Sequence, residues 1–250
     1  MQSRDGLSGR ARSEVMSRIV EVFGRRPVLL PVVHPASRAS ALASIDVGVA
    51  AGVPGIFLID QGMTPDEVLE LVVHVRALHP ALWIGVNLLA RKPAAALGSA
   101  LDACNGRIDG IWSDDAGIDE RAPEQPHADA FLDARRARRW TGLYFGGTAF
   151  KYQREIADAD LGRAAALAAT YMDVVCTSGP GTGKAADPSK VIAMKRAIPK
   201  ASLALASGVT AENAHAYTPH VDAFLVGTGI ESSFGVLDRA KVDALLRAIS

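Results

Sequence analysis

Residues 203–228, LALASGVTAENAHAYTPHVDAFLVGT, contain two short apolar runs that each end in a glycine-containing polar loop. The first run, Leu203–Ala206, leads into Ser207-Gly208, and the second, Ala223–Val226, leads into Gly227-Thr228. The segment between the two runs has helical periodicity over 211–217. Buried parallel strands read as near-continuous apolar runs because helices cover them on the outside. The stretch therefore predicts a strand–helix–strand unit of a parallel sheet.

The same alternation continues along the chain. The predicted strands are, in order, Val28–Val33, Gly55–Ile59, Trp83–Leu88, Gly110–Trp112, Leu143–Phe145, Val174–Cys176, Leu203–Ala206 and Ala223–Val226. The predicted helices are Ala39–Ala51, Pro65–Leu78, Pro93–Cys104, Ala128–Arg139, Leu161–Tyr171, Pro188–Ala197, Ala211–Tyr217 and Arg239–Ile249. Eight such units predict an α/β fold of the (β/α)8 TIM-barrel type. Periodicity does not show closure of the sheet, so a doubly wound open sheet is the alternative.

The domain organisation follows from the length and from the N-terminal segment. A chain of 250 residues fits one barrel, and we expect a single domain over 1–250. Residues 1–26 are expected to form an N-terminal extension, with a helix over Glu14–Phe23 that caps the bottom of the barrel. Capping residues before proline at Thr64-Pro65 and Asp187-Pro188 support the predicted helix starts.

Composition excludes several classes of partner. Hydrophobic residues make up 49% of the chain, and Lys+Arg and Asp+Glu are both 27, so the formal net charge is zero. This balance predicts no nucleic-acid partner and no anionic membrane surface. Two cysteines without a disulfide pattern, no signal peptide and no apolar run of spanning length predict a cytoplasmic protein. A homo-oligomer is compatible with all of these features.

The two glycine loops of the opening stretch predict a phosphate site. In TIM barrels the functional face is at the carboxyl ends of the strands, and the loops after strands seven and eight commonly bind phosphate. Glycine lets backbone N–H groups approach an anion closely. We therefore expect Ser207, Gly208, Gly227 and Thr228 to bind phosphate, because both loops follow the strands where this site is found. Glycines that only turn the chain are the alternative.

The loop after the sixth predicted strand, Gly179-Pro180-Gly181-Thr182-Gly183-Lys184, superficially resembles a Walker A loop. Ser178 stands where that motif needs glycine, and Ala185 stands where it needs a hydroxyl to hold magnesium. A P-loop NTPase is therefore not expected. We expect Gly181, Thr182, Gly183 and Lys184 to form a lid with Lys184 reaching an anionic ligand, and a solvated loop without a role is the alternative.

Carboxylates follow the second and fourth predicted strands. Asp60, Asp114 and Asp115 are expected to act as general acid and base, to bind sugar hydroxyls or to hold a divalent cation. Asn87 lies between them in strand order and is expected to orient the substrate. Each aspartate could instead serve as a turn or capping residue. No cofactor is predicted, and no His/Cys cluster supports a metal site.

Lys151 and His34 also follow predicted strands. Lys151 comes after the fifth strand, where a lysine could form a Schiff base or neutralise an oxyanion. A position on the rim of the barrel is the alternative, because Lys151 is several residues past the strand. His34 follows the first strand, where a hydrogen-bonded structural histidine is more common than a proton shuttle.

Three stretches resemble the BtpA family of phosphate-binding TIM barrels, which is named for a photosystem I biogenesis protein. They are residues 173–179 (DVVCTSG), 206–213 (ASGVTAEN) and 221–228 (VDAFLVGT), and the likeness is best over the last third of the chain. The resemblance implies a barrel with a phosphate site, and in some members an assembly role. Asp60-Gln61-Gly62 departs from the glutamate-asparagine pair of that family, so the N-terminal half of the pocket is expected to bind a different group.

These features together predict an enzyme that acts on a small phosphorylated metabolite, a sugar phosphate or a nucleotide. Ribosyl-phosphate chemistry, by glycosidic cleavage or phosphoribosyl transfer, is the favoured reaction. One alternative is an aldolase or isomerase that uses Lys151 as a Schiff base. Another is a non-catalytic BtpA-like assembly or nucleotide-binding factor. A fold alone does not distinguish these hypotheses.

Overall fold

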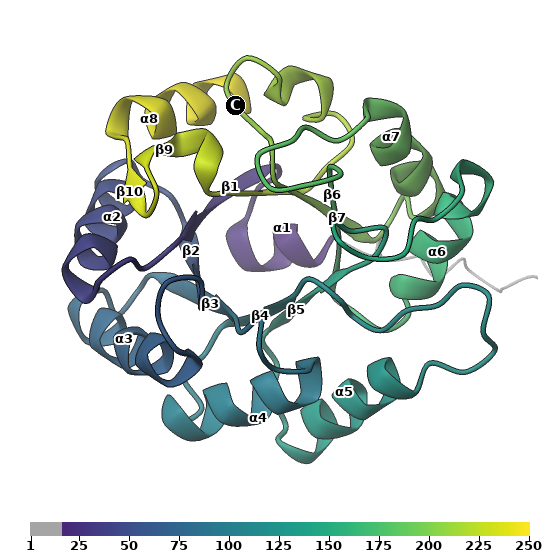
Figure 1. Ribbon diagram of the computed structural model, residues 1–250, viewed down its shortest axis with the longest axis horizontal. Helices are drawn as coiled ribbons and strands as arrows, with labels where there is room; N and C mark the ends of the chain where they lie inside the picture. Colours follow the sequence, from purple (N-terminus) through teal and green to yellow (C-terminus); the bar gives the residue numbers. More distant parts are fainter. Residues whose placement is uncertain (1–16) are drawn as a thin grey trace, which may run out of the picture.

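A computed structural model describes residues 17–250 as a closed barrel of eight parallel strands (Figure 1). The strands are β1 (Val28–Val33), β2 (Gly55–Ile59), β3 (Trp83–Asn87), β4 (Gly110–Ser113), β5 (Leu143–Gly147), β6 (Val174–Ser178), β7 (Ser202–Ala206) and β8 (Ala223–Val226). Strand β1 pairs with β8 from Val28 opposite Ala223 to Pro31 opposite Val226. This pairing closes the sheet. The predicted TIM barrel is therefore confirmed, and the open-sheet alternative is wrong.

Helices follow the strands on the outside of the barrel. They are α2 (Arg38–Ala50), α3 (Pro65–Leu78), α4 (Pro93–Ala103), α5 (Pro126–Ala137), α6 (Leu161–Ala168), α7 (Pro188–Ala197) and α8 (Arg239–Ala248). Short elements that the sequence did not predict are the 3-10 turns η1 (Asp158–Asp160) and η3 (Thr228–Ile230) and the hairpin of β9 (Glu231–Ser233) and β10 (Val236–Leu237).

The helix predicted over Ala211–Tyr217 is wrong, because only the 3-10 turn η2 (Ala214–Ala216) forms there. The backbone bonds of this turn run to the third residue back, from the Ala216 N–H to the Asn213 carbonyl at 3.1 Å and from the Tyr217 N–H to the Ala214 carbonyl at 2.9 Å. This is the pattern of a 3-10 turn. The Asn213 side chain accepts the Thr210 N–H at 2.9 Å and donates to the Gly208 carbonyl at 2.8 Å, which holds the start of the turn against the loop after β7.

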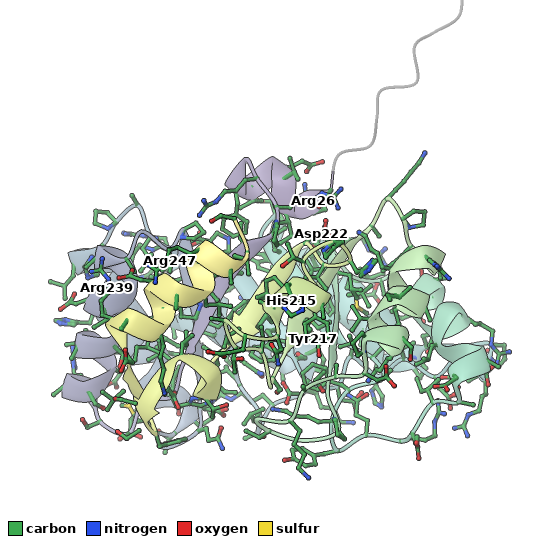
Figure 2. All side chains as sticks on the ribbon, turned by 90° about the horizontal axis from the view of Figure 1, so that it is seen from above. Arg26, His215, Tyr217, Asp222, Arg239 and Arg247 are labelled. Carbon is green, nitrogen blue, oxygen red and sulfur yellow. The ribbon has the colours of Figure 1, made fainter. Side chains whose placement is uncertain are left out.

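The N-terminal helix α1 (Arg18–Phe23) covers the bottom of the barrel, opposite the loops that follow the strands (Figures 1 and 2). Ile19 is fully buried among the side chains of the barrel interior. Ser17 Oγ lies 2.8 Å from the hydroxyl of Ser202 at the start of β7. The described part of the predicted helix thus lies where it was expected, and Glu14 to Met16 lie outside the described residues.

Inward-facing side chains fill the barrel in alternating positions along each strand. Phe57 lies at the centre of an aromatic cluster, with ring centroids 5.0 Å from Phe145 and 5.5 Å from Trp112. Outward-facing side chains form a second apolar cluster with the helices. Because the interior is packed, polar chemistry is restricted to the residues at the carboxyl ends of the strands.

The same arrangement of an aspartate, a strand N–H and a basic side chain occurs three times at the bottom of the barrel. Asp109, Asp173 and Asp222 immediately precede β4, β6 and β8, and each carboxylate accepts the N–H of a residue on the preceding strand. Each also pairs with a cation from the helix that leads into that preceding strand: Arg76 of α3, Arg135 of α5 and Lys195 of α7. These ion pairs connect helices to strands at the end of the barrel opposite the functional face.

Candidate functional site

Lys151 lies at the centre of a polar cluster in the mouth of the barrel. Its Nζ is 3.4 Å from Ser207 Oγ, 3.4 Å from Thr182 Oγ1 and 3.9 Å from Asp114 Oδ2. The backbone N–H of Lys151 donates to Ser178 Oγ at 2.8 Å, which holds the loop after β5 against the end of β6. The structure thus brings together predicted residues from four different strand ends and places the amine inside the mouth.

Asp114 and Asn87 form the second part of the cluster. Asn87 is almost completely buried, and its Nδ2 donates to Asp114 Oδ1 at 2.8 Å. Burial raises the pKa of Asp114 and the nearby charge of Asp60 adds to this, while Lys151 and the Asn87 hydrogen bond oppose it. An acid–base group works best when its pKa lies close to the working pH, and the pKa of Asp114 is shifted in that direction. Asp114 is therefore suited to proton transfer.

The Asp60 and Asp115 carboxylates accept hydrogen bonds from backbone N–H groups of nearby loops. Asp60 accepts the Leu89 N–H at 2.7 Å, and Asp115 accepts the Gly117 N–H at 2.8 Å. These bonds shape the loops after β3 and β4, and they do not bring either carboxylate into contact with Lys151. Their predicted roles in acid–base chemistry stay predictions.

The two glycine loops differ in their surroundings. Gly208 is buried with φ +66°, and a β-carbon there would lie 2.2 Å from the carbonyl carbon of Lys184. A β-carbon on Gly227 would lie 2.5 Å from the His34 ring. Thr228 begins η3, and within residues 17–250 the N–H groups of Thr228 and Gly229 have no acceptor. The first N–H groups of a helical turn are free in this way, and an anion could accept from them.

The loop between β6 and α7 extends over the mouth (Figure 1). Thr182 joins this loop to the loop after β5, since Tyr152 Oη lies 3.3 Å from both the backbone nitrogen and the hydroxyl oxygen of Thr182. The Lys184 N–H donates to the Gly181 carbonyl at 3.1 Å and closes a tight turn. Thr182, Gly183 and Lys184 are exposed at the tip. This placement is compatible with the predicted lid, whose motion stays a prediction.

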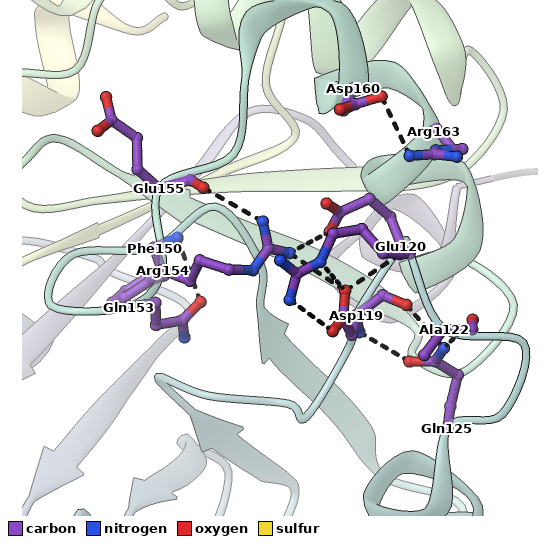
Figure 3. A network of polar contacts seen from close by, with 11 residues as sticks. Asp119, Glu120, Ala122, Gln125, Phe150, Gln153, Arg154, Glu155, Asp160 and Arg163 are labelled. Carbon is purple, nitrogen blue, oxygen red and sulfur yellow. Dashed lines mark hydrogen bonds and ion pairs between the residues drawn. The ribbon is translucent and has the colours of Figure 1, made fainter.

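A polar network joins the loops after β4 and β5 (Figure 3). Arg154 donates to Glu120 Oε2 at 2.5 Å and to Asp119 Oδ1 at 3.3 Å. Hydrogen bonds from Arg121, together with the charges of Arg121 and Arg154, hold the pKa of Asp119 well below its usual range. Gln153 donates to the backbone carbonyl of Asp114. The network therefore fixes Asp114 relative to the loop that carries Lys151. Sequence patterns alone did not indicate this network.

His34 is held by a residue that sequence reasoning missed. Its Nδ1 lies 2.7 Å from Glu231 Oε1, both residues are buried, and the imidazole stacks on Phe234 with ring centroids 5.2 Å apart. Glu231 was missed because it begins the unpredicted β9–β10 hairpin. Glu231 follows the last predicted strand, and nothing in the sequence around it indicates a contact with His34.

Two cavities open beside the cluster. One of about 300 Å³ lies between the loops after β3 and β4 and is lined by Asn87, Asp114 and Lys92. The other, of about 450 Å³, lies between the loops after β5 and β6 and includes Lys151 and Ser178. Residues 17–250 contain no group of three or more His, Cys, Asp or Glu side chains placed to hold a metal ion. No helix within that range is long and apolar enough to cross a membrane.

Comparisons with known proteins identify the fold. No family model and no curated protein matches the chain, so the BtpA resemblance stays a prediction. Phosphoribosyl anthranilate isomerase from Thermus thermophilus is similar in structure, with a TM-score of 0.61 and 14% identity over 89% of this chain and 98% of that one. For 3-keto-L-gulonate-6-phosphate decarboxylase from Vibrio cholerae the TM-score is 0.63, with 14% identity over 90% and 98% of the two chains.

Tryptophan synthase subunit alpha from Legionella pneumophila has a TM-score of 0.63 and 11% identity, over 94% of this chain and 98% of that one. At such identities the likeness establishes the TIM-barrel fold and nothing finer.

Proposed function

We propose that this barrel is an enzyme that acts on a small phosphorylated metabolite bound at its C-terminal mouth. The observation that carries the proposal is the position of the Lys151 amine, within 3.9 Å of Asp114 and 3.4 Å of Ser207 inside the mouth. An amine beside a carboxyl with a raised pKa provides a fixed positive charge and a proton-transfer group in one place.

Each group has a role in this proposal. Lys151 neutralises charge on the ligand, Asp114 transfers the proton, and Asn87 orients Asp114 through its hydrogen bond. The phosphate is bound by the loops of Ser207-Gly208 and Gly227-Thr228, and the free N–H groups of η3 support that placement. The neighbouring 300 Å³ and 450 Å³ cavities give room for the rest of the ligand.

The substrate class draws support from the similar structures. Two of them, phosphoribosyl anthranilate isomerase and 3-keto-L-gulonate-6-phosphate decarboxylase, are named for phosphorylated sugar compounds. Within this class we favour ribosyl-phosphate chemistry, with Asp114 as the acid–base group. The position of the Lys151 amine inside the mouth also supports a second candidate, an aldolase or isomerase that forms a Schiff base at Lys151.

A thermal-shift panel of inorganic phosphate, ribose 5-phosphate, phosphoribosyl pyrophosphate, triose and hexose phosphates and nucleotides tests the proposal. A ligand at a hundredfold excess over its Kd stabilises the native state by ~2.7 kcal/mol. We expect one class to raise the melting temperature, and Lys151→Met to abolish the shift while the exposed control Lys200→Met retains it. No shift with any compound, from a folded sample, would overturn the proposal.

Turnover assays with the compound that binds separate the remaining hypotheses. Product formation that is lost in Asp114→Asn supports the acid–base reaction. A borohydride-reduced adduct of a carbonyl sugar phosphate on Lys151 would instead support the Schiff-base enzyme. Tight binding without turnover would favour a non-catalytic factor of the BtpA-like kind.

A further inference from the structure

The cavity of about 450 Å³ between the loops after β5 and β6 contains a lysine that the proposed reaction does not use. Its wall is formed by the loop from Ala149 to Ile156, by Ser178 to Pro180 and by the first turn of α7. Lys190 projects from that turn and lines the cavity together with the apolar side chains of Phe150 and Leu161.

The Lys190 ammonium is held by backbone carbonyls alone. Its Nζ donates to the carbonyl of Ala149 and to the carbonyl of Ser178, the latter at 2.8 Å. No carboxylate within residues 17–250 forms an ion pair with it. The charged side chains that share the cavity wall are Lys151, Arg154, Glu155, Asp158 and Asp187. A largely buried ammonium without a carboxylate partner is costly to keep charged.

Lys195, five residues further along α7, provides the contrast. Its Nζ also donates to a backbone carbonyl, that of Ala201 at 2.8 Å, but it pairs with Asp222 at 2.7 Å. The two lysines share a helix and a similar partly buried setting. They differ in that only Lys195 has a carboxylate to stabilise its charge.

The surroundings of Lys190 favour a reactive amine. Burial lowers the pKa of Lys190 to about 8, so about a quarter of the side chain is neutral at pH 7.5, against about 0.1% for an ordinary lysine. A desolvated lysine with a lowered pKa is a nucleophile for carbonyl compounds. The two carbonyl acceptors use N–H donors of the amine and leave the lone pair of the neutral form unused.

We propose that Lys190 is a carbonyl-reactive lysine that forms an imine with a small aldehyde or ketone bound in this cavity. The neutral Nζ attacks the carbonyl carbon, and the C–N bond forms as the C=O electron pair moves to oxygen. A proton passes from nitrogen to that oxygen. A second proton, taken from solvent, converts the hydroxyl into water, which leaves as the nitrogen lone pair forms the C=N bond of the iminium. No oxidant or reductant is required.

The hydrogen bonds around Lys190 tolerate this change. An iminium has one N–H, so one of the two carbonyls loses its lysine donor. The Ala149 carbonyl also accepts from Thr177 Oγ1 at 3.0 Å, and it therefore keeps a partner when Lys190 reacts. The inference does not depend on phosphate binding at the mouth, and it assigns imine chemistry to a different lysine from Lys151.

Reductive alkylation of the full chain tests the inference. The protein is incubated at pH 7.5 with glycolaldehyde, which carries no phosphate, and cyanoborohydride, and adducts at each lysine are quantified by peptide mass spectrometry. We expect Lys190 to be labelled about tenfold faster than Lys195, with a labelling rate that reaches half its maximum near pH 8. Lys190→Met should remove the fast adduct, while Lys190→Arg keeps the charge without the reactive amine.

Labelling of Lys190 no faster than that of Lys195, or fast labelling confined to Lys151, would overturn the inference. The comparison between lysines is made within the unsubstituted protein, so it does not require either variant to fold. Failure of the phosphate panel with fast labelling of Lys190 would overturn the proposed function alone. A positive panel with slow labelling of Lys190 would overturn this inference alone.

Discussion

Lys190→Met should change how the stability of the barrel depends on pH. Burial lowers the pKa of Lys190 in the folded protein from its ordinary value of 10.5 to about 8. Between these two values the unfolded chain binds more protons than the folded chain, so the free energy of unfolding rises with pH. Below about pH 8 both states carry the ammonium, and the folded protein bears the whole cost of burying it.

The size of the effect follows from the two pKa values. A pKa shift of one unit corresponds to ~1.4 kcal/mol, so the shift of Lys190 from 10.5 to about 8 corresponds to ~3 kcal/mol. Solvent reaches part of the side chain, so we discount this figure to ~2 kcal/mol. Methionine also leaves the Ser178 carbonyl without this donor, which costs ~1–3 kcal/mol. That cost is the same at every pH and drops out when pH dependences are compared.

Urea unfolding followed by circular dichroism at pH 7.5 and pH 10 measures the difference. The unsubstituted protein should gain ~2 kcal/mol relative to Lys190→Met over this interval. Tyrosines and other groups titrate equally in both proteins, and the exposed Lys200→Met serves as a control that should follow the unsubstituted protein. Parallel pH dependences of the two proteins, or a relative loss in the unsubstituted one, would refute the burial of an uncompensated charge at Lys190.

Three further predictions concern the mouth. Asp114→Asn should raise the melting temperature at pH 7, because the raised pKa of Asp114 makes its ionised form costly, and should have no such effect near pH 3, where the native carboxyl is protonated. Gly208→Ala should destabilise the fold by more than the ~1–2 kcal/mol of a left-handed conformation. Urea unfolding should show the excess over Gly106→Ala, whose φ is +74° with nothing within 4 Å. Glu231→Ala should cost ~1–3 kcal/mol by leaving buried His34 without its partner, and Phe234→Ala, which keeps the His34–Glu231 bond, is the comparison in the same unfolding measurement.

The barrel itself could be predicted from the sequence because its strands are buried on both faces. Continuous apolar runs gave β1, β2 and β8 with the observed bounds. Closure could not be predicted, since it rests on the pairing of Val28 to Pro31 with β8, a contact across almost the whole chain. The helix predicted over 211–217 failed for a local reason, because periodicity does not distinguish a helix from a turn whose backbone bonds run to the third residue back.

For the candidate site, the sequence could predict which residues follow the strands but not which of them come together. Position after a strand identified Asn87, Asp114 and Lys151, which do come together. It could not separate them from Asp60, which is engaged by the backbone of a neighbouring loop. Lys190 was missed because it lies on a helix, where a lysine normally faces solvent. Its proposed role rests on the Ala149 and Ser178 carbonyls that accept from its amine, and the sequence does not reveal these contacts.

The backbone around Lys151 supports the proposal that the mouth binds a ligand, because residues there adopt conformations that cost stability. Among residues 17–250, five non-glycine residues have positive φ. Asn105 and Arg139 follow helices, where a left-handed residue ordinarily ends the helix. The other three, Ala149, Tyr152 and Ser207, lie in the loops after β5 and β7 with φ between 48° and 67°.

Each of these three conformations costs ~1–2 kcal/mol and persists only if its surroundings enforce it. The enforcing contacts converge on the loop that carries Lys151: Lys190 holds the Ala149 carbonyl, Tyr152 reaches Thr182, and Ser207 faces the Lys151 amine. Loops that only connect a strand to a helix have no need of such cross-links. An amine held in place before a ligand arrives loses little freedom on binding, and this is the property that a catalytic or binding lysine requires.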